Sequence, residues 1–211
     1  MILASRINNQ SYNQKMPKIT SPHVEVELDE LLAAEYDYIA QTANQANEDR
    51  ARVSSFYLIA VGSLVAALFG TQLFDSDKFT QIVKIMFSGL FVLLTLLGTS
   101  TIMQLARLRS AWYESMLAMN QIKDFAMKQN PELKRAFRWK TETLPAKYKT
   151  GSVSYYQAFE VALIGGLMFG AATFFMQEAF FAFSVLHWVV STIFGMLAIY
   201  MQLRIYKRVL Q

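Results

Sequence analysis

The hydrophobic and polar positions of this chain separate into four long stretches that carry no formal charge. These windows are residues 53–74, 85–106, 161–177 and 179–203, and residues 155–159 continue the third beyond Glu160. A helix rises about 1.5 Å per residue, so a window of about 22 residues matches a hydrocarbon core of about 30 Å. Because a charged side chain at mid-bilayer costs roughly 2.5 to 3.5 kcal/mol, four such windows favour membrane spans over the buried helices of a soluble bundle. We therefore expect an all-α, polytopic membrane protein with four transmembrane helices in two hairpins.

Lysine and arginine are distributed unevenly around these windows. Five precede the first window, ten lie between the second and the third, and three follow the fourth, whereas the first hairpin turn holds only Lys78 and Lys84. The second turn, expected at Gln177 and Glu178, holds none. The positive-inside rule then places both termini in the cytoplasm, and we expect an integral protein of a bacterial-type inner membrane. This bias also explains the net charge of +4 without a nucleic-acid partner.

The windows divide the chain into five segments. We expect a mobile N-terminal tail (1–22), a cytoplasmic helix (23–52), a first transmembrane hairpin (53–106), a cytoplasmic helical connection (107–152), and a second transmembrane hairpin with a short basic C-terminal tail (153–211). Apolar positions at steps of three and four predict one helix from Leu28 into the first span and another from the second span to about Gln129. Asn130 and Pro131 then predict a helix stop and a restart.

The two cytoplasmic segments carry opposite charges. Residues 1–52 sum to −3 and residues 107–152 to +6, so we expect the acidic helix to pack against the basic one through exposed ion pairs. The acidic residues that we expect to face the basic helix are Glu25, Glu27, Asp29, Glu30, Glu35 and Asp37. The alternative is that the basic residues contact anionic lipid headgroups. Arg135, Arg138, Trp139 and Lys140 suit that interface.

Small residues predict where the spans pack closely. Ala162, Gly166 and Gly170 stand four residues apart on the third span, and Gly62 and Ala66 repeat this spacing on the first. The stretches that begin at Val53 and Val153 also share five identities in 18 aligned positions. This is compatible with a duplicated hairpin or with chance similarity between apolar helices.

Two ionisable side chains and two glutamines in or beside the windows are candidates for chemistry. Glu160 and His187, the latter expected near the middle of the fourth span, could form a proton or cation relay. Alternatively, Glu160 lies at headgroup depth and pairs with Arg52 or Arg107, while a neutral His187 bonds to a neighbouring helix. Gln104 and Gln202 are candidates to line a pore, since the bilayer penalises unsatisfied amides.

Enzyme motifs are missing from the sequence. There is no cysteine, no nucleophile elbow and no phosphate-binding glycine loop, and the only histidines are His23 and His187. We therefore expect no catalytic residue, cofactor or metal site.

A stretch of the chain resembles the SLATT group of bacterial membrane proteins, which includes predicted pore-forming effectors. The resemblance covers residues 35–129 and rests on a polar helix that enters a short-turned hairpin and on the helix that leaves it. The first helix carries Tyr36, Ala40, Ala43, Ala46 and Arg50, and the second reads Arg109-Ser-Ala-Trp112-Tyr113-Glu114 and Ile122-Lys-Asp-Phe125. The resemblance implies an oligomer that permeabilises or senses the membrane.

These observations lead to a functional expectation at the level of class. We expect a non-enzymatic, oligomeric channel or pore-forming component whose cytoplasmic helices serve assembly or gating. Its partners would be the lipid bilayer, anionic headgroups, and copies of the chain or other membrane subunits. The alternatives are a structural or accessory subunit of a larger membrane complex, and a small proton-coupled transporter that uses Glu160.

Overall fold

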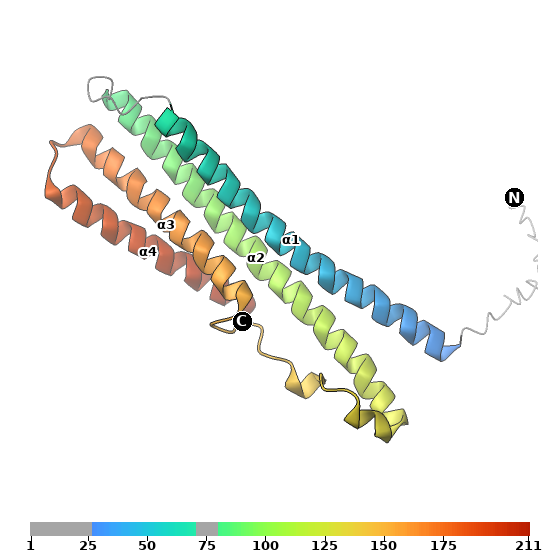
Figure 1. The fold of residues 1–211 in the computed structure, drawn as a ribbon. Helices are drawn as coiled ribbons and strands as arrows, with labels where there is room; N and C mark the ends of the chain where they lie inside the picture. Colours follow the sequence, from blue (N-terminus) through green and yellow to red (C-terminus); the bar gives the residue numbers. More distant parts are fainter. Residues whose placement is uncertain (1–26, 71–79) are drawn as a thin grey trace, which may run out of the picture.

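The computed structural model describes residues 27–70 and 80–211, without the side chain of Phe69. Residues 1–26 and 71–79, and with them the expected tail, His23, Glu25 and the end of the first window, lie outside the described residues. Figure 1 shows four long helices. These are α1 (Leu28–Gly70), α2 (Gln81–Gln129), α3 (Val153–Phe180) and α4 (Val185–Leu210). The described chain contains no strand, which confirms the predicted all-α fold.

The first two helices form an antiparallel pair that is much longer than a membrane is thick. Their 43 and 49 residues correspond to roughly 65 and 74 Å at 1.5 Å per residue. Figure 1 shows that α1 and α2 run side by side and extend well past α3 and α4. The helix predicted from Leu28 into the first span and the helix predicted to reach Gln129 are therefore both confirmed.

We call the part of this pair outside the uncharged windows, residues 28–52 and 107–129, the helical extension. Ile39, Ala43 and Met119 are buried between its two helices, and the Lys123 Nζ lies 5.6 Å from the centroid of the Tyr36 ring. The acidic side chains of residues 27–37 are exposed, and no ion pair joins α1 to α2 among the described residues. The two helices do pack together, but apolar burial holds them and the expected ion pairs do not.

The connection between α2 and α3 contains two short 3-10 helices, Pro131–Arg135 and Thr141–Thr143. The Asn130 Oδ1 accepts a hydrogen bond from the Glu132 backbone N–H at 3.1 Å, and Pro131 occupies the first turn. This confirms the predicted stop and restart. Trp139, one of the expected headgroup contacts, is exposed in this connection.

The last two helices form the second hairpin. Ser152 and Ser184 cap α3 and α4, each accepting a backbone N–H from the first turn. Helix α3 continues through Gln177 and Glu178 to Phe180, so the turn expected at Gln177 and Glu178 was placed too early. The turn was predicted there because the charged Glu178 interrupts the run of apolar residues. The helix continues because Glu178 has partners on two other helices, as described below.

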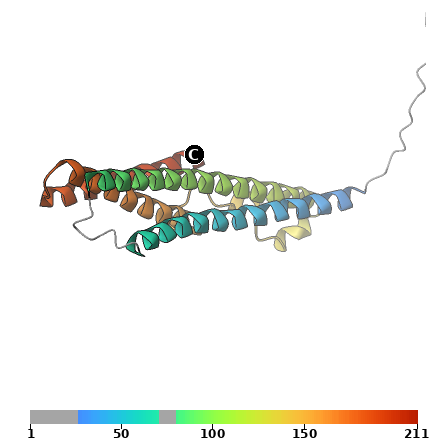
Figure 2. The same ribbon diagram turned by 90° about the horizontal axis from the view of Figure 1, so that it is seen from above.

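Helices α2 and α3 form the centre of the bundle. Each contacts the other three helices, whereas α1 and α4 do not contact each other. Figure 2 shows α1 and α4 on opposite sides of α2. The tightest packing lies around the centre, where Ile102, Ala106, Val161 and Ala162 have no exposed surface.

The outer surface of the bundle is strongly apolar. Phe56, Ile82 and Trp188 are 73, 70 and 58 % exposed, and many other large apolar side chains resemble them. Four helices of the described chain are long and apolar enough to cross a membrane. Such a surface is stable when lipid surrounds it and is rare on soluble monomers. The predicted four-span membrane fold is therefore confirmed, and the protein is an integral membrane protein.

Candidate functional site

All four helices contribute to a polar cluster at the end of the spans from which the helical extension projects. We call this end the basic end, and we call Arg50, Arg109, Ser154 and Tyr206 the arginine cluster. All four side chains are buried, at 8, 7, 4 and 2 % exposure. A hydrogen bond from the Arg50 Nη1 to the Ser154 Oγ joins α1 to the first turn of α3.

The two arginines of this cluster have few partners. The Arg109 Nε donates to the Lys147 carbonyl oxygen at 3.3 Å, and its guanidinium carbon lies 4.2 Å from the centroid of the Trp112 ring. The Arg50 Nε is buried and has no hydrogen-bond partner. Neither arginine forms an ion pair with a carboxylate in the described part of the chain. The cluster therefore holds two positive charges and no negative charge from the described residues.

Burial dominates the electrostatics of the arginine cluster. It lowers the pKa of Arg50, and the nearby charge of Arg109 lowers that pKa further, while Tyr206 acts in the opposite direction. Burial also lowers the pKa of Arg109. It raises the pKa of Tyr206, although both arginines act to lower it. Arginine nevertheless stays protonated in proteins, so both positive charges persist.

A second polar cluster lies deeper in the bundle, where α2, α3 and α4 meet. The Gln202 Nε2 donates to the Thr99 Oγ1 at 3.0 Å and to the Thr95 carbonyl oxygen at 3.4 Å. The Thr95 Oγ1 lies 3.2 Å from the Gly165 carbonyl oxygen, to which it donates. The Gln202 Oε1 is buried without a partner. The amide of Gln202 thus joins α4 to α2 and leaves one acceptor unused, and the Thr95 hydroxyl joins α2 to α3.

At the opposite end of the bundle, which we call the hairpin end, three charged or ionisable groups contact one another. The Lys84 Nζ lies 3.2 Å from the Glu178 Oε2, and the His187 Nδ1 lies 3.4 Å from the Glu178 Oε1. The Lys84 Nζ also donates to the Glu178 carbonyl oxygen at 3.1 Å. Their side chains are only 22, 16 and 6 % exposed. This clamp, as we call it, joins α2, α3 and α4.

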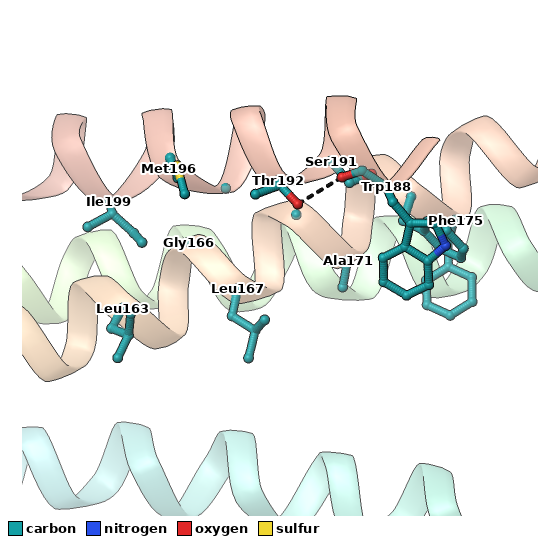
Figure 3. A pocket seen from close by; sticks show the side chains of 13 residues that line it. Leu163, Gly166, Leu167, Ala171, Phe175, Trp188, Ser191, Thr192, Met196 and Ile199 are labelled. Atoms are coloured by element: carbon teal, nitrogen blue, oxygen red, sulfur yellow. Dashed lines mark hydrogen bonds between the residues drawn. The ribbon is translucent and has the colours of Figure 1, made fainter. Parts of the chain in front are cut away.

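Helices α3 and α4 approach most closely at glycines. A Cβ added at Gly166 would lie 2.6 Å from the Gly195 carbonyl oxygen, and one added at Gly170 would lie 3.1 Å from the Ser191 carbonyl oxygen. Beside this contact an apolar groove of about 430 Å³ opens between the two helices. Figure 3 shows Trp188 over one end of the groove, and Leu163 and Leu167 pointing away from α4.

The structure places the predicted packing residues unequally. Ala162 and Gly166 are buried and Gly170 is partly buried, all within the contacts of α3. Gly62 and Ala66 are exposed on α1, and a Cβ at Gly62 would meet no atom within 4 Å. The same spacing therefore marks a helix contact in α3 but none within the described chain in α1.

The four predicted polar site residues are not gathered in one place. Gln202 lies in the three-helix junction, whereas Gln104 lines a separate cavity of about 330 Å³ between α1 and α2. Glu160 is exposed near the start of α3 and has no ion pair among the described residues, so neither Arg52 nor Arg107 holds it there.

His187 lies in the first turn of α4 and not near its middle, because α4 begins at Val185. It contacts Glu178 and not Glu160. Glu160 and Glu178 are 18 positions apart on α3, which corresponds to roughly 27 Å of helix. The structure thus does not bring the members of the expected relay together.

Sequence reasoning missed the most distinctive charged residues. Arg50 and Arg109 were used to orient the spans and to support the resemblance to SLATT proteins, but not as site residues, and Lys84 and Glu178 were assigned to hairpin turns. The sequence did contain a signal for the pair of Lys84 and Glu178. Lys84 directly precedes the second window and Glu178 directly follows the third, so two opposite charges were expected at the same side of the membrane.

A signal was present for the arginines too. Arg50 continues the spacing of Ala43 and Ala46 at a step of four, and Arg109 precedes Trp112 by three residues on the face that leads to Met116. The exposed Arg52 and Arg107 fall off these faces.

No group of three or more His, Cys, Asp or Glu side chains that could hold a metal ion is present in the described residues. Comparison of the chain with protein-family models, with curated proteins and with solved structures gives no match. The function must therefore be argued from the placement of the chain's own side chains.

Proposed function

We propose that several copies of this protein assemble into a membrane channel or pore, with the pathway between copies. The interior of a single copy supports this placement, because it is filled with side chains. Ile102, Ala106, Ala158, Val161 and Ala162 at its centre have no exposed surface. A polar path through one copy would require space at this position.

The observation that carries the proposal is a group of polar side chains that line part of the otherwise apolar cavity between α1 and α2. Arg52, Ser100, Thr101 and Gln104 contribute to it beside apolar side chains, and Gln104 is exposed. Lipid tails cannot satisfy an amide, so the surface that carries Gln104 is better matched by water or by another polar surface. A pathway bordered by the α1 and α2 faces of neighbouring copies provides both.

The helical extension supports assembly independently of the cavity. Leu28, Leu31, Tyr38 and Phe125 lie beyond the uncharged windows and are 57, 54, 66 and 40 % exposed. Large apolar side chains outside the membrane favour contact with another protein surface. The resemblance to SLATT proteins implies an oligomer as well.

The test is ion flux through liposomes that contain the purified protein. We expect wild-type protein to release potassium or chloride, and Gln104→Leu to change the flux several-fold because it removes a polar lining group. The matched control is Gln121→Leu, the same change at an exposed position of α2 in the helical extension. Liposomes that stay tight with a homo-oligomer in the membrane would contradict the proposal.

A structural or accessory subunit is the second candidate. The apolar groove between α3 and α4 and the exposed side chains of the helical extension favour it, since both could receive other chains. This candidate predicts tight liposomes together with co-purification of different membrane proteins in a fixed stoichiometry. Chemical cross-linking followed by mass spectrometry distinguishes such subunits from copies of the chain. A proton-coupled transporter that uses Glu160 is the third candidate. A proton-flux assay that compares the wild-type protein with the Glu160→Gln variant tests it.

A further inference from the structure

The arginine cluster buries two positive charges without a balancing anion. Arg50 and Arg109 are more than nine-tenths buried, and the Arg50 Nε has no hydrogen-bond partner. No carboxylate of residues 27–70 or 80–211 forms an ion pair with either side chain. Buried charges are normally paired, and a guanidinium cannot escape by losing its proton. The cluster therefore lacks a partner of negative charge.

The surroundings of the two arginines add to the positive potential. Arg50 donates to Ser154 in the first turn of α3, where the helix dipole is positive. Tyr206 lies close enough to both arginines for their charges to influence its pKa. Lys147 contributes its carbonyl oxygen to Arg109, but its amino group pairs with Glu114. No neighbour described here supplies the missing negative charge.

The arginine cluster also lies at a defined depth. Arg50 precedes the first uncharged window by three residues, Arg109 follows the second by three, and Tyr206 follows the fourth by three. Ser154 directly precedes residues 155–159, the extension of the third window. All four helices therefore bring their cluster member to the boundary between hydrocarbon and water. The phosphate groups of lipids lie in this layer.

We propose that the arginine cluster binds a phosphate group between Arg50 and Arg109. A phosphate offers several acceptor oxygens and a negative charge, and guanidinium groups bind it through parallel N–H donors. The unused Arg50 Nε–H and the Nη groups of Arg109 are the donors for it. The phosphate can belong to the headgroup of an anionic phospholipid or to a soluble phosphate ion. The proposal does not depend on whether the protein conducts ions.

Three probes distinguish the two sources. The full chain is purified in phosphate-free, uncharged detergent and titrated with phosphatidylglycerol, with diacylglycerol of the same acyl chains, and with inorganic phosphate. Thermal unfolding and native mass spectrometry report binding. If the phosphate comes from lipid, phosphatidylglycerol raises the melting temperature and stays bound, and diacylglycerol does neither. If inorganic phosphate alone has this effect, the source is soluble. A wild-type protein that responds to neither phosphate probe overturns the proposal, whatever the variants do.

Matched arginine variants locate the site. We expect Arg50→Gln and Arg109→Gln to weaken phosphatidylglycerol or phosphate binding at least about tenfold, because each removes a charged donor. Arg52→Gln and Arg107→Gln are the controls, since these exposed arginines lie two residues away on the same helices. Equal loss in all four variants would indicate a diffuse charge effect and would overturn the proposed site. Unchanged binding in Arg50→Gln and Arg109→Gln would overturn it as well.

Discussion

At the hairpin end of the bundle Lys84, Glu178 and His187 bury groups that compensate one another, whereas at the basic end Arg50 and Arg109 bury two charges of one sign. Both clusters join several helices and both are largely shielded from water. The clamp is complete within the chain, so it is explained by structure alone. The arginine cluster is not complete, and a ligand is the simplest way to complete it. Charge compensation thus distinguishes a structural centre from a candidate binding site.

The largest expected effect tests the clamp. Glu178→Gln should lower the free energy of unfolding by about 3 kcal/mol, because it leaves Lys84 without a compensating charge in a shielded place. Thermal and denaturant unfolding in detergent micelles measures this change. The control is Glu114→Gln, which removes the more exposed pair with Lys147 and should cost at most about 1 kcal/mol. Equal losses in the two variants would show that the clamp carries no special stability.

A second variant tests the close contact between α3 and α4. Helix α4 carries His187 of the clamp at one end and Tyr206 of the arginine cluster at the other. Gly166→Ala should cost about 2 kcal/mol, because its Cβ would press on the Gly195 carbonyl oxygen and on Ile199. Gly62→Ala is the control, since nothing lies within 4 Å of its Cβ, and it should change stability by less than about 0.5 kcal/mol. Equal melting temperatures for the two variants in micelles would contradict the close contact between α3 and α4.

The smallest expected effect gives the sharpest contrast between the ends. In phosphate-free detergent Arg50→Gln should change the free energy of unfolding by less than about 1 kcal/mol, and toward greater stability, because it relieves repulsion from Arg109. The exchange of charge for amide is the same as in Glu178→Gln, but the expected sign is opposite. Unfolding in micelles without and with phosphatidylglycerol measures it. A loss as large as that of Glu178→Gln would mean that Arg50 is already compensated within the chain.

The helices were predictable because they depend on features of neighbouring residues, namely the spacing of apolar positions and the length of the stretches without charge. The continuity of α1 and α2 and the stop at Asn130 follow from such local rules. The second hairpin turn was predicted too early because the charge of Glu178, taken alone, indicates the end of an apolar span, whereas α3 continues to Phe180. Its partners Lys84 and His187 come from other helices, and pairing across helices decides whether a charge can continue a span.

The candidate sites were less predictable, since they depend on which way each helix faces. Gly62 and Gly166 share a spacing motif, but only Gly166 faces another helix of the chain. Gln104 and Gln202 occupy equivalent places in the two hairpins, but Gln202 faces the three-helix junction and Gln104 faces the outer cavity. Rotation about the helix axis is set by packing, which a single sequence does not display.

Helix α2 runs for 49 residues from the hairpin end to the tip of the helical extension and contains no proline. One ladder of backbone hydrogen bonds therefore continues from the apolar surface that faces lipid into the part of the helix that stands in water. The outer part of α2 packs against α1 through Ile39, Ala43 and Met119, so the two helices leave the bilayer as a pair. The position of the helical extension is thus set by the same two helices that cross the membrane.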